Sequence, residues 1–366
     1  MNTSKNTRIL LAPLDWGLGH ATRCIPLIRY LQQKECEVVL AADGAAASLL
    51  AAEFPGISIR ILKGYNIRYN SGSSLFGSML LQLPRIFSSI RQEHLWLKEL
   101  LEKEEFDFII SDNRPGFWNK KTHSIYITHQ LLIHSGKGNW LNRQLQKLHA
   151  RYMKKFTEVW VPDLQGNKNL AGELSHPSQP IIQPFYLGLL SRLEKKQVAE
   201  QEYDLTVLLS GPEPQRTILE EKIYRQLEVY LGKVLFVRGL PQPNLSALQS
   251  YPHITVHDHL SAAELQHKLS SSKLVICRSG YTTLMDLMKL GKKAFLIPTP
   301  GQPEQEYLAQ YMQEQSYFPF QQQNVFDLSS AIKIADSFTY QHPFAETDFE
   351  AYKKVLDTLL NSREHK

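Results

Sequence analysis

The chain has 366 residues, more than one compact domain usually needs, so we expect two domains. Hydrophobic residues make up 43% and charged residues 21%, which is typical of a folded protein and excludes a largely disordered chain. The formal net charge of +5 is too small to indicate a nucleic-acid partner, but it is compatible with an acidic ligand or an anionic membrane surface.

The N-terminal half alternates apolar, strand-like runs with amphipathic, helix-like stretches. The first run, RILLAP at residues 8–13, is followed by an amphipathic stretch near residues 23–34. Further apolar runs are EVVLAAD (37–43), SIRIL (58–62), FDFIISD (106–112), SIYIT (124–128) and EVWVPD (158–163). This alternation is typical of parallel strands joined by helical crossovers. We therefore predict a Rossmann-like N-terminal domain over residues 1–190.

The C-terminal half repeats this pattern after a charged stretch, residues 189–204, which we interpret as a linker. The runs are LTVLLS (205–210), KVLFVRG (233–239), ITVHDHL (254–260), KLVICRSG (273–280) and KAFLIPTP (293–300). They predict a second Rossmann-like domain over residues 200–343, followed by an amphipathic helix within residues 344–366 that packs back. Because open parallel sheets bind ligands at the carboxyl ends of their strands, we expect an α/β fold whose two domains face a central cleft.

The first strand leads into a glycine-containing loop, APLDWGLGHATR at residues 12–23. Gly17 and Gly19 would allow the backbone to approach a bound group closely, and His20 could then act as a base. The alternative is an ordinary tight turn between a strand and a helix, in which the histidine only caps or packs. Taken alone, the loop favours the ordinary turn, so the rest of the chain has to decide.

The segment from residue 274 to residue 309 is the most informative part of the sequence. A buried strand runs into Ser279 and Gly280, and a helix opens near Thr282. Free N–H groups, hydroxyls and the positive end of a helix dipole make such a helix start a suitable site for a phosphate. Asp286, four residues after Thr282, shares a helix face with it and could accept hydrogen bonds from ribose hydroxyls. The alternative is a capped helix with a solvated aspartate.

The next strand delivers the turn PGQPEQE, residues 300–306. It presents Gln302, Glu304, Gln305 and Glu306 at the carboxyl end of the strand. Amide and carboxylate groups gathered in this way suit a polyhydroxylated sugar, which favours a ligand-binding interpretation of the whole segment.

Three weaker signals remain. His257, Asp258 and His259 could suggest a metal, but two histidines two residues apart without a third ligand are more often surface loop residues. Asp112 and Arg114 end another strand and could face the cleft, although a turn with local capping is an equal alternative. No Asp-x-Asp pair follows a strand. The sequence therefore does not support an enzyme that transfers sugars with a metal ion held by such a pair, and we expect no metal.

Residues 274–309 resemble the donor-binding signature of the GT-B glycosyltransferases of family 28, which includes the N-acetylglucosaminyltransferase that makes the lipid-linked peptidoglycan precursor. The shared pattern is CRSG, a threonine, an acidic residue, a glycine, a proline and two glutamines. The resemblance implies donor-binding residues at the diphosphate (Ser279, Gly280 and Thr282), the ribose (Asp286) and the sugar (Glu304 and Gln305). Arg278 is a further predicted donor-binding residue. Asp286 is shorter than the glutamate usual in the family.

The resemblance extends weakly to the rest of the chain. DWGLGHATR is similar to the family's N-terminal loop, which implies that His20 is catalytic and orients the acceptor or accepts its proton. The implied acceptor-side residues are Asp15, Gly17, Gly19, Asp112, His129 and Gln130. LLSGPEPQR (208–216) implies that Ser210 and Gly211 lie near the diphosphate, although Pro212 and Pro214 remove N–H donors. The VHDHL loop is implied to lie near a uracil base, through His259 and Leu260.

We therefore predict a cofactor-independent glycosyltransferase. It would move a sugar from a nucleotide diphosphate sugar, a UDP-sugar, to an acceptor hydroxyl of a glycan or lipid-linked saccharide, with inversion and without a metal. One alternative is a nucleotide-sugar hydrolase or epimerase, because relatives with this fold pass the same donor to water or invert a sugar carbon. A second alternative is a non-catalytic sensor that retains only the donor site.

Two further observations concern the compartment. Cys24, Cys36 and Cys277 follow neither a metal nor a disulfide spacing, and the apolar run near the N-terminus is too short for a signal peptide, so we expect a cytoplasmic protein. Residues 73–101 mix apolar side chains with Arg85 and Arg91. This segment fits either a peripheral contact with the inner face of the cell membrane or a pair of helices packed in the N-terminal domain.

Overall fold

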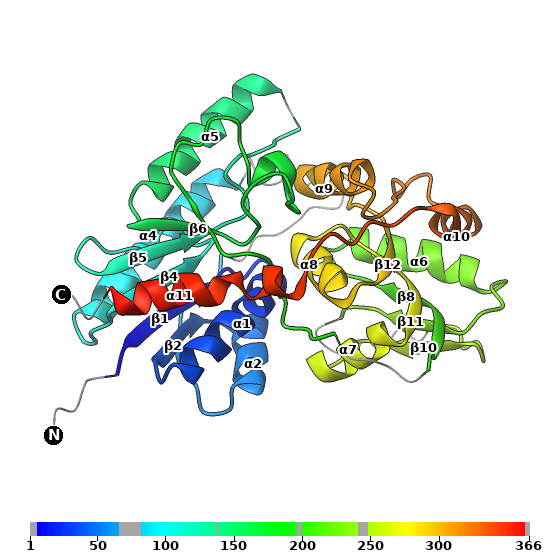
Figure 1. Ribbon diagram of the computed structural model, residues 1–366, viewed down its shortest axis with the longest axis horizontal. Helices are drawn as coiled ribbons and strands as arrows, with labels where there is room; N and C mark the ends of the chain where they lie inside the picture. Colours follow the sequence, from blue (N-terminus) through cyan, green and yellow to red (C-terminus); the bar gives the residue numbers. More distant parts are fainter. Residues whose placement is uncertain (1–5, 66–81, 137, 196–199, 241–247, 363–366) are drawn as a thin grey trace. The chain divides into compact units, whose positions relative to one another are not determined.

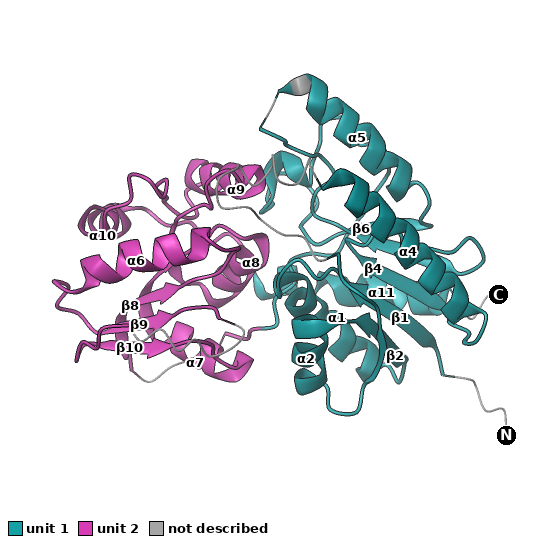
Figure 2. Cartoon of the chain, turned by 180° about the vertical axis from the view of Figure 1, so that it is seen from behind, with its two compact units in different colours: residues 1–67, 79–192, 345–366 teal, residues 68–78, 193–344 magenta. Residues whose placement is uncertain are grey.

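The computed structural model describes residues 6–65, 82–136, 138–195, 200–240 and 248–362. These residues form two compact units (Figure 2). Unit 1 contains the described residues of 1–67, 79–192 and 345–366, and unit 2 contains those of 193–344. Each unit is a parallel sheet with helices, so the predicted α/β fold with two Rossmann-like sheets is confirmed.

The sheet of unit 1 contains seven strands in the order β3-β2-β1-β4-β5-β6-β7, all paired in parallel. The strands are β1 (Arg8–Pro13), β2 (Glu37–Ala42), β3 (Ser58–Ile61), β4 (Phe108–Asp112), β5 (His123–Ile127), β6 (Glu158–Val161) and β7 (Phe185–Tyr186). Five of the first six lie within the predicted runs, and β5 begins one residue before its run, at His123. Strands covered on both faces, such as β1 and β4, read as continuous apolar sequence. The edge strand β7 is too short to leave such a pattern.

The helices of unit 1 surround this sheet (Figure 1). They are α1 (Gly19–Gln33), α2 (Gly44–Glu53), α4 (Leu83–Leu101), α5 (Asn139–Met153) and α11 (Ala351–Asn361), with short 3-10 turns at Gly172–Leu174 and Glu346–Phe349. α1 starts earlier than predicted, so the glycine-containing loop ends at Leu18, and His20 is the second residue of the helix. Residues 73–81 of the segment with the two alternatives lie outside the described residues; most of its remainder is the single helix α4.

The C-terminal helix α11 packs against α1 within unit 1. It buries Tyr352, Leu356 and Leu359, whose spacing places them on one helix face. The Tyr30 hydroxyl of α1 donates to the Asp357 carboxylate at 2.9 Å, and the Lys34 ammonium lies 2.9 Å from the same carboxylate. α11 therefore completes unit 1.

The sheet of unit 2 contains five parallel strands in the order β10-β9-β8-β11-β12. Its strands are β8 (Tyr203–Leu208), β9 (Val234–Val237), β10 (Ile254–His257), β11 (Ser272–Cys277) and β12 (Lys293–Leu296). Its helices are α6 (Gln215–Leu227), α7 (Ala262–Ser270), α8 (Tyr281–Leu290), α9 (Pro303–Glu314) and α10 (Leu328–Ser337). Val207, Phe236, Ile276 and Phe295 join the central strands in one apolar core.

Local sequence explains where the helices that flank the predicted donor segment begin and end. α8 starts after Gly280 and stops at Gly291, whose φ of 62° is a left-handed conformation that glycine adopts readily. α9 has Pro303 at its first position, where the missing N–H costs nothing. The PGQPEQE segment is therefore a turn only up to Gln302, which corrects the prediction that Glu304 and Gln305 lie in a loop.

Strand order reverses beside the first strand of each unit: β1 lies between β2 and β4, and β8 lies between β9 and β11. Loops diverge at such a switch point and leave room for a ligand at the carboxyl ends of the strands. Among the described helices, none is both long enough and apolar enough to cross a bilayer.

Candidate functional site

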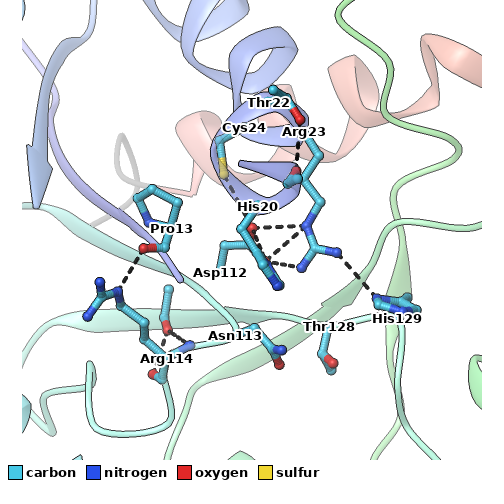
Figure 3. Close-up of polar contacts among 12 residues, drawn as sticks. Pro13, His20, Thr22, Arg23, Cys24, Asp112, Asn113, Arg114, Thr128 and His129 are labelled. Carbon is cyan, nitrogen blue, oxygen red and sulfur yellow. Dashed lines mark hydrogen bonds and ion pairs between the residues drawn. The ribbon is translucent and has the colours of Figure 1, made fainter. Parts of the chain in front are cut away.

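A cluster of charged and polar side chains lies at the switch point of unit 1. Asp112, the last residue of β4, is fully buried. The Nε of Arg23 donates to its two oxygens at 2.9 and 3.1 Å, and Nη2 of the same guanidinium forms an ion pair with it. The Nδ1 of His20 lies 3.2 Å from Oδ2, and the Cys24 thiol donates to the same oxygen at 3.5 Å (Figure 3).

The electrostatics of this cluster fix the charge of each group. Burial alone would raise the pKa of Asp112, but the Arg23 guanidinium and the His20 contact hold that pKa below its ordinary value. Burial and the nearby Arg23 charge lower the pKa of His20, in spite of the opposing effect of Asp112. Near neutral pH, Asp112 is thus a carboxylate and His20 is a neutral imidazole.

This charge state assigns the tautomer of His20. An ionised carboxylate can only accept hydrogen bonds, so Nδ1 of His20 carries the proton and donates to Asp112. The lone pair is then on Nε2. An imidazole held in this tautomer by a buried aspartate is the arrangement that serves as a general base in many enzymes.

The loop before His20 is a turn that depends on glycine. Gly17 has a φ of 82°, which disfavours any other residue, and its N–H donates to the carbonyl of Asp15 at 2.9 Å. Gly19 is the first residue of α1, and its carbonyl accepts a hydrogen bond from the Thr22 hydroxyl. Gly17 therefore shapes the turn, and Gly19 belongs to the helix that positions His20.

Asp15 has a specific structural task within unit 1. Its carboxylate accepts the main-chain N–H of Tyr65 at 3.1 and 3.2 Å. A Cβ on Gly64 would collide with this carboxylate, so only glycine allows the approach. Asp15 therefore ties the loop after β1 to residues 64–65.

Arg114 does not face open space, in contrast to the alternative in which it lies on a cleft. It is fully buried: Nε donates to the carbonyl of Pro13 at 2.7 Å, and Nη1 donates to Glu93 at 2.9 Å. Glu93, on α4, also accepts from the Tyr65 hydroxyl and from the Gly116 N–H. These hydrogen bonds connect the ends of β1 and β4 to α4, close to the candidate base. Glu93 was not predicted from the sequence.

His129 and Gln130 follow β5, beside β4 in the sheet. The Nδ1 of His129 lies 3.3 Å from Nη1 of Arg23, so His129 joins the cluster through Arg23. The N–H of Gln130 donates to the Thr128 hydroxyl at 3.1 Å. Arg23 was missed from the sequence, although its spacing of three from His20 places both on one helix face.

In unit 2, the loops after β8, β11 and β12 form the switch point. Ser210 and Gly211 are exposed after β8. Gly211 has a φ of 105°, and a Cβ there would lie 3.6 Å from the hydroxyl of Thr299. These loops therefore approach one another closely, as expected of a ligand-binding edge.

Arg278, Ser279 and Gln305, which are predicted donor-binding residues, have buried side chains with partners inside the protein. Arg278 is buried and donates to the carbonyls of Ile297, Pro298 and Gln215 at 2.8 to 3.2 Å. The Ser279 hydroxyl donates to the carbonyl of Gln305 at 2.7 Å, and the side-chain oxygen of Gln305 accepts from the Thr299 N–H. These three side chains hold the loops from inside, because each has polar partners in the protein.

Near the start of α8, other predicted donor-binding residues are less buried than these three. Gly280 is the N-cap residue, with no side chain to occupy the first N–H groups of the helix. Thr282 and Asp286 are half-buried on α8, and Glu304 is half-buried in the first turn of α9. The start of α8 therefore has no side-chain cap on its first N–H groups.

The predicted base loop is only partly a surface. His259 is exposed, but the side chain of Leu260 packs with Leu235 and Val237 in the core, so only its main chain can meet a ligand. Asp258 accepts from Nη1 of Arg238 at 2.9 Å, and Arg238 also pairs with Glu220. Within the described ranges, no three His, Cys, Asp or Glu side chains are close enough to hold a metal ion.

Comparisons with known proteins agree with this architecture. Residues 242–346 match the Glycosyltransferase family 28 C-terminal domain. The chain is similar to the solved glycotransferase of kitacinnamycin (TM-score 0.66, 12% identity), covering 98% of this chain and 95% of that one. It is also similar to MurG of Acinetobacter baumannii (TM-score 0.55, 12% identity), covering 98% of this chain and 100% of that one. A third similar structure is the spinosyn rhamnosyltransferase SpnG in complex with thymidine diphosphate (TM-score 0.60, 15% identity), covering 97% of this chain and 96% of that one. No curated protein sequence matches the chain.

The two parallel sheets and these structural similarities define the GT-B fold. Within that fold, residues 242–346 match the C-terminal domain of glycosyltransferase family 28.

Proposed function

We propose that the protein transfers a sugar from a UDP-sugar to an acceptor hydroxyl, with inversion and without a metal. The observation that carries the proposal is the Asp112–His20 pair, which leaves the Nε2 lone pair of His20 as a base at the carboxyl edge of unit 1. The acceptor would be a glycan or a lipid-linked saccharide.

The reaction needs one proton acceptor and one leaving-group site. The acceptor oxygen attacks the anomeric carbon from the side opposite the diphosphate, and its proton passes to Nε2 of His20. The bond between the anomeric carbon and the diphosphate oxygen breaks, and the electron pair leaves with the nucleoside diphosphate. Attack from the opposite side inverts the configuration.

Unit 2 supplies the leaving-group site in this proposal. The N-terminal N–H groups of α8 after Gly280 and the hydroxyl of Thr282 would stabilise the departing diphosphate, which is why the proposal needs no metal. Asp286 would hold the ribose hydroxyls, and Glu304 would contact the sugar. The exposed His259 and the main chain of Leu260 would contact the base.

Two other functions would use the same donor site. A hydrolase or epimerase would pass the sugar to water or invert one of its carbons, and a sensor would bind the donor without reaction. Incubation with labelled UDP-sugars and a cell lipid extract separates the three. Labelled lipid supports the proposal, whereas free or epimerised sugar contradicts it in favour of an enzyme of another kind, and an unchanged but bound donor indicates a sensor.

The donor base can be tested separately. A ligand that binds only the folded state raises the melting temperature in proportion to its affinity. We expect UDP and UDP-sugars to stabilise the protein more than thymidine diphosphate and its sugars at equal concentration. Equal or stronger stabilisation by the thymidine series would overturn the assignment of uracil.

We also propose a cytoplasmic protein that contacts the inner face of the cell membrane through α4 and α5. The two helices are neighbours, because Ile86 and Tyr152 pack against the same apolar cluster. Their exposed cations are Arg85, Arg91, Lys98, Arg143, Lys147 and Arg151, and α5 has no acidic residue. Phe87, Leu95 and Trp140 are exposed apolar side chains on the same helices. Cations with exposed aromatic rings suit an anionic bilayer surface.

Sedimentation with vesicles tests this contact. We expect binding to vesicles that contain anionic phosphatidylglycerol, weaker binding for Trp140→Ala, and none to neutral phosphatidylcholine. Leu231→Ala, which removes an exposed leucine of unit 2, is the control and should bind like the wild type. Equal sedimentation with both lipids, or an unaffected Trp140→Ala variant, would contradict the contact.

A further inference from the structure

A chain of polar contacts links His129 to the candidate base. Nδ1 of His129 lies 3.3 Å from Nη1 of Arg23, and Nε of Arg23 donates to Asp112. Asp112 in turn contacts Nδ1 of His20 (Figure 3). Arg23, Asp112 and His129 are at most 5% exposed, so water screens these contacts little.

The chemistry of each group fixes the direction of every hydrogen bond in this chain. A guanidinium has donors only, and a carboxylate has acceptors only. Nδ1 of His129 must therefore accept from Arg23, which places its proton on Nε2. Nδ1 of His20 must donate to Asp112, which leaves the lone pair on its Nε2. The two histidines thus hold opposite tautomers around one ion pair.

We propose that Arg23 and His129 are positioning residues for the proposed base: His129 orients the Arg23 guanidinium, Arg23 clamps the Asp112 carboxylate, and Asp112 holds His20 with its Nε2 lone pair available. The proposal rests on the proposed function for the reaction that His20 serves. The tautomers themselves depend only on the protein.

The alternative is that Arg23 and Asp112 form an ion pair that stabilises the fold without affecting His20. The geometry disfavours it. Oδ2 of Asp112 accepts from Nε of Arg23 and also contacts Nδ1 of His20, so a rotation of the carboxylate that breaks the Arg23 contact also disturbs the His20 contact. A lysine has a single ammonium and could not reproduce this fork.

Nuclear magnetic resonance of histidine-labelled protein tests the tautomers directly. Long-range nitrogen–proton spectra at about pH 8, above the ordinary histidine pKa of about 6.5, distinguish a protonated from an unprotonated ring nitrogen. Spectra of His20→Ala and His129→Asn assign the two signals. We expect the proton of His20 on Nδ1 and that of His129 on Nε2. Both histidines in one tautomer, or His129 protonated on Nδ1, would overturn the proposal.

A matched pair of variants tests the positioning role. In His129→Asn, the amide oxygen can accept from Arg23 in place of Nδ1, whereas His129→Leu offers no acceptor. We expect His129→Leu to lower kcat about tenfold or more at unchanged donor affinity, and His129→Asn to retain most activity, because a misplaced base costs rate. Equal losses in both variants would show a packing role only.

The two arms separate failure of this inference from failure of the proposed function. The spectra need no substrate, so they test the tautomers even if the protein transfers sugar to no acceptor. Absence of transfer would reject the proposed function only. Arg23→Lys adds an independent check. It keeps a positive charge beside Asp112, yet we expect His129 to become a mixture of tautomers, and an unchanged His129 spectrum would contradict the role of Arg23.

Discussion

Nδ1 of His20 lies 3.2 Å from the carboxylate of Asp112, although the two residues are 92 positions apart in the chain. The contact exists because β1 and β4 are neighbours in the sheet of unit 1 and Asp112 is the last residue of β4. α1 follows β1 and brings His20 to the same edge. Parallel pairing of two strands distant in sequence thus brings together the candidate base, His20, and the carboxylate that orients it, Asp112.

Replacing this base tests the proposed role of His20. We expect His20→Ala to lower kcat by about 10²-fold or more, since a positioned proton acceptor is lost. Donor affinity should remain, because the proposed donor groups belong to unit 2. His267→Ala, which alters an exposed histidine of α7, is the control. Turnover and melting temperature measured on the same preparation decide the question: near-normal turnover in folded His20→Ala would reject the catalytic role.

The pH dependence follows from the direction of the His20 pKa. The base must be neutral, so kcat/KM rises with pH through this pKa. Burial and Arg23 lower it from its ordinary value of 6.5, and the acidic limb of the profile should therefore have its midpoint below 6.5.

Arg23→Gln removes the charge that opposes protonation of His20. We expect this variant to move the acidic limb to higher pH. Profiles of kcat/KM for both proteins check the sign, and a limb that stays in place or shifts downward would contradict the electrostatic account of the cluster.

The sequence predicted the strands well and the roles of single side chains less well. Strands such as β4 and β11 are covered on both faces and read as unbroken apolar runs, which makes them visible without a structure. The two residues of β7 give no such signal. Secondary structure follows from local pattern, so it could be predicted over most of the described chain.

The partners of polar side chains depend on contacts that local pattern does not contain. The CRSG motif marks the carboxyl end of β11, but only the fold shows that the buried Arg278 donates to three carbonyls and that the Ser279 hydroxyl donates to Gln305. Glu93 was missed for the same reason, because its partner Arg114 lies 21 residues further on. A motif therefore located the edge of the sheet, while tertiary contacts decide which atoms remain for a ligand.

The proposed phosphate site can be tested at Gly280. Its φ of −71° suits any residue, and a Cβ there would have only the Thr283 hydroxyl within 4 Å, at 3.9 Å. Gly280→Ala should therefore fold normally and bind UDP nearly as well as the wild type. Gly280→Asp should also fold, since aspartate is a good N-cap residue, but its charge should repel the diphosphate. Calorimetry with UDP is the measurement, and unchanged affinity in Gly280→Asp would remove the site from α8.

The last prediction concerns stability in acid and depends on Asp112. Its pKa in the folded protein lies below the ordinary value of 3.8, so the ionised carboxylate contributes stability at pH values above about 4. That contribution is lost as the pH falls from about 4 toward the lower pKa of the folded state. Asp112→Asn leaves the Arg23 charge buried without a counter-ion, and removal of one partner from a buried pair costs about 3–5 kcal/mol.

We therefore expect the melting temperature of Asp112→Asn to lie well below that of the wild type at pH 7, with the difference shrinking below about pH 4. Asp336→Asn, which changes an exposed carboxylate on α10, is the control and should melt like the wild type throughout. Melting curves recorded by circular dichroism across this pH range provide the measurement. A difference between Asp112→Asn and wild type that is the same at every pH would mean that the pKa of Asp112 is equal in the folded and unfolded protein. Arg23 and His20 would then not favour the ionised carboxylate, and the tautomer assigned to His20 would lose its basis.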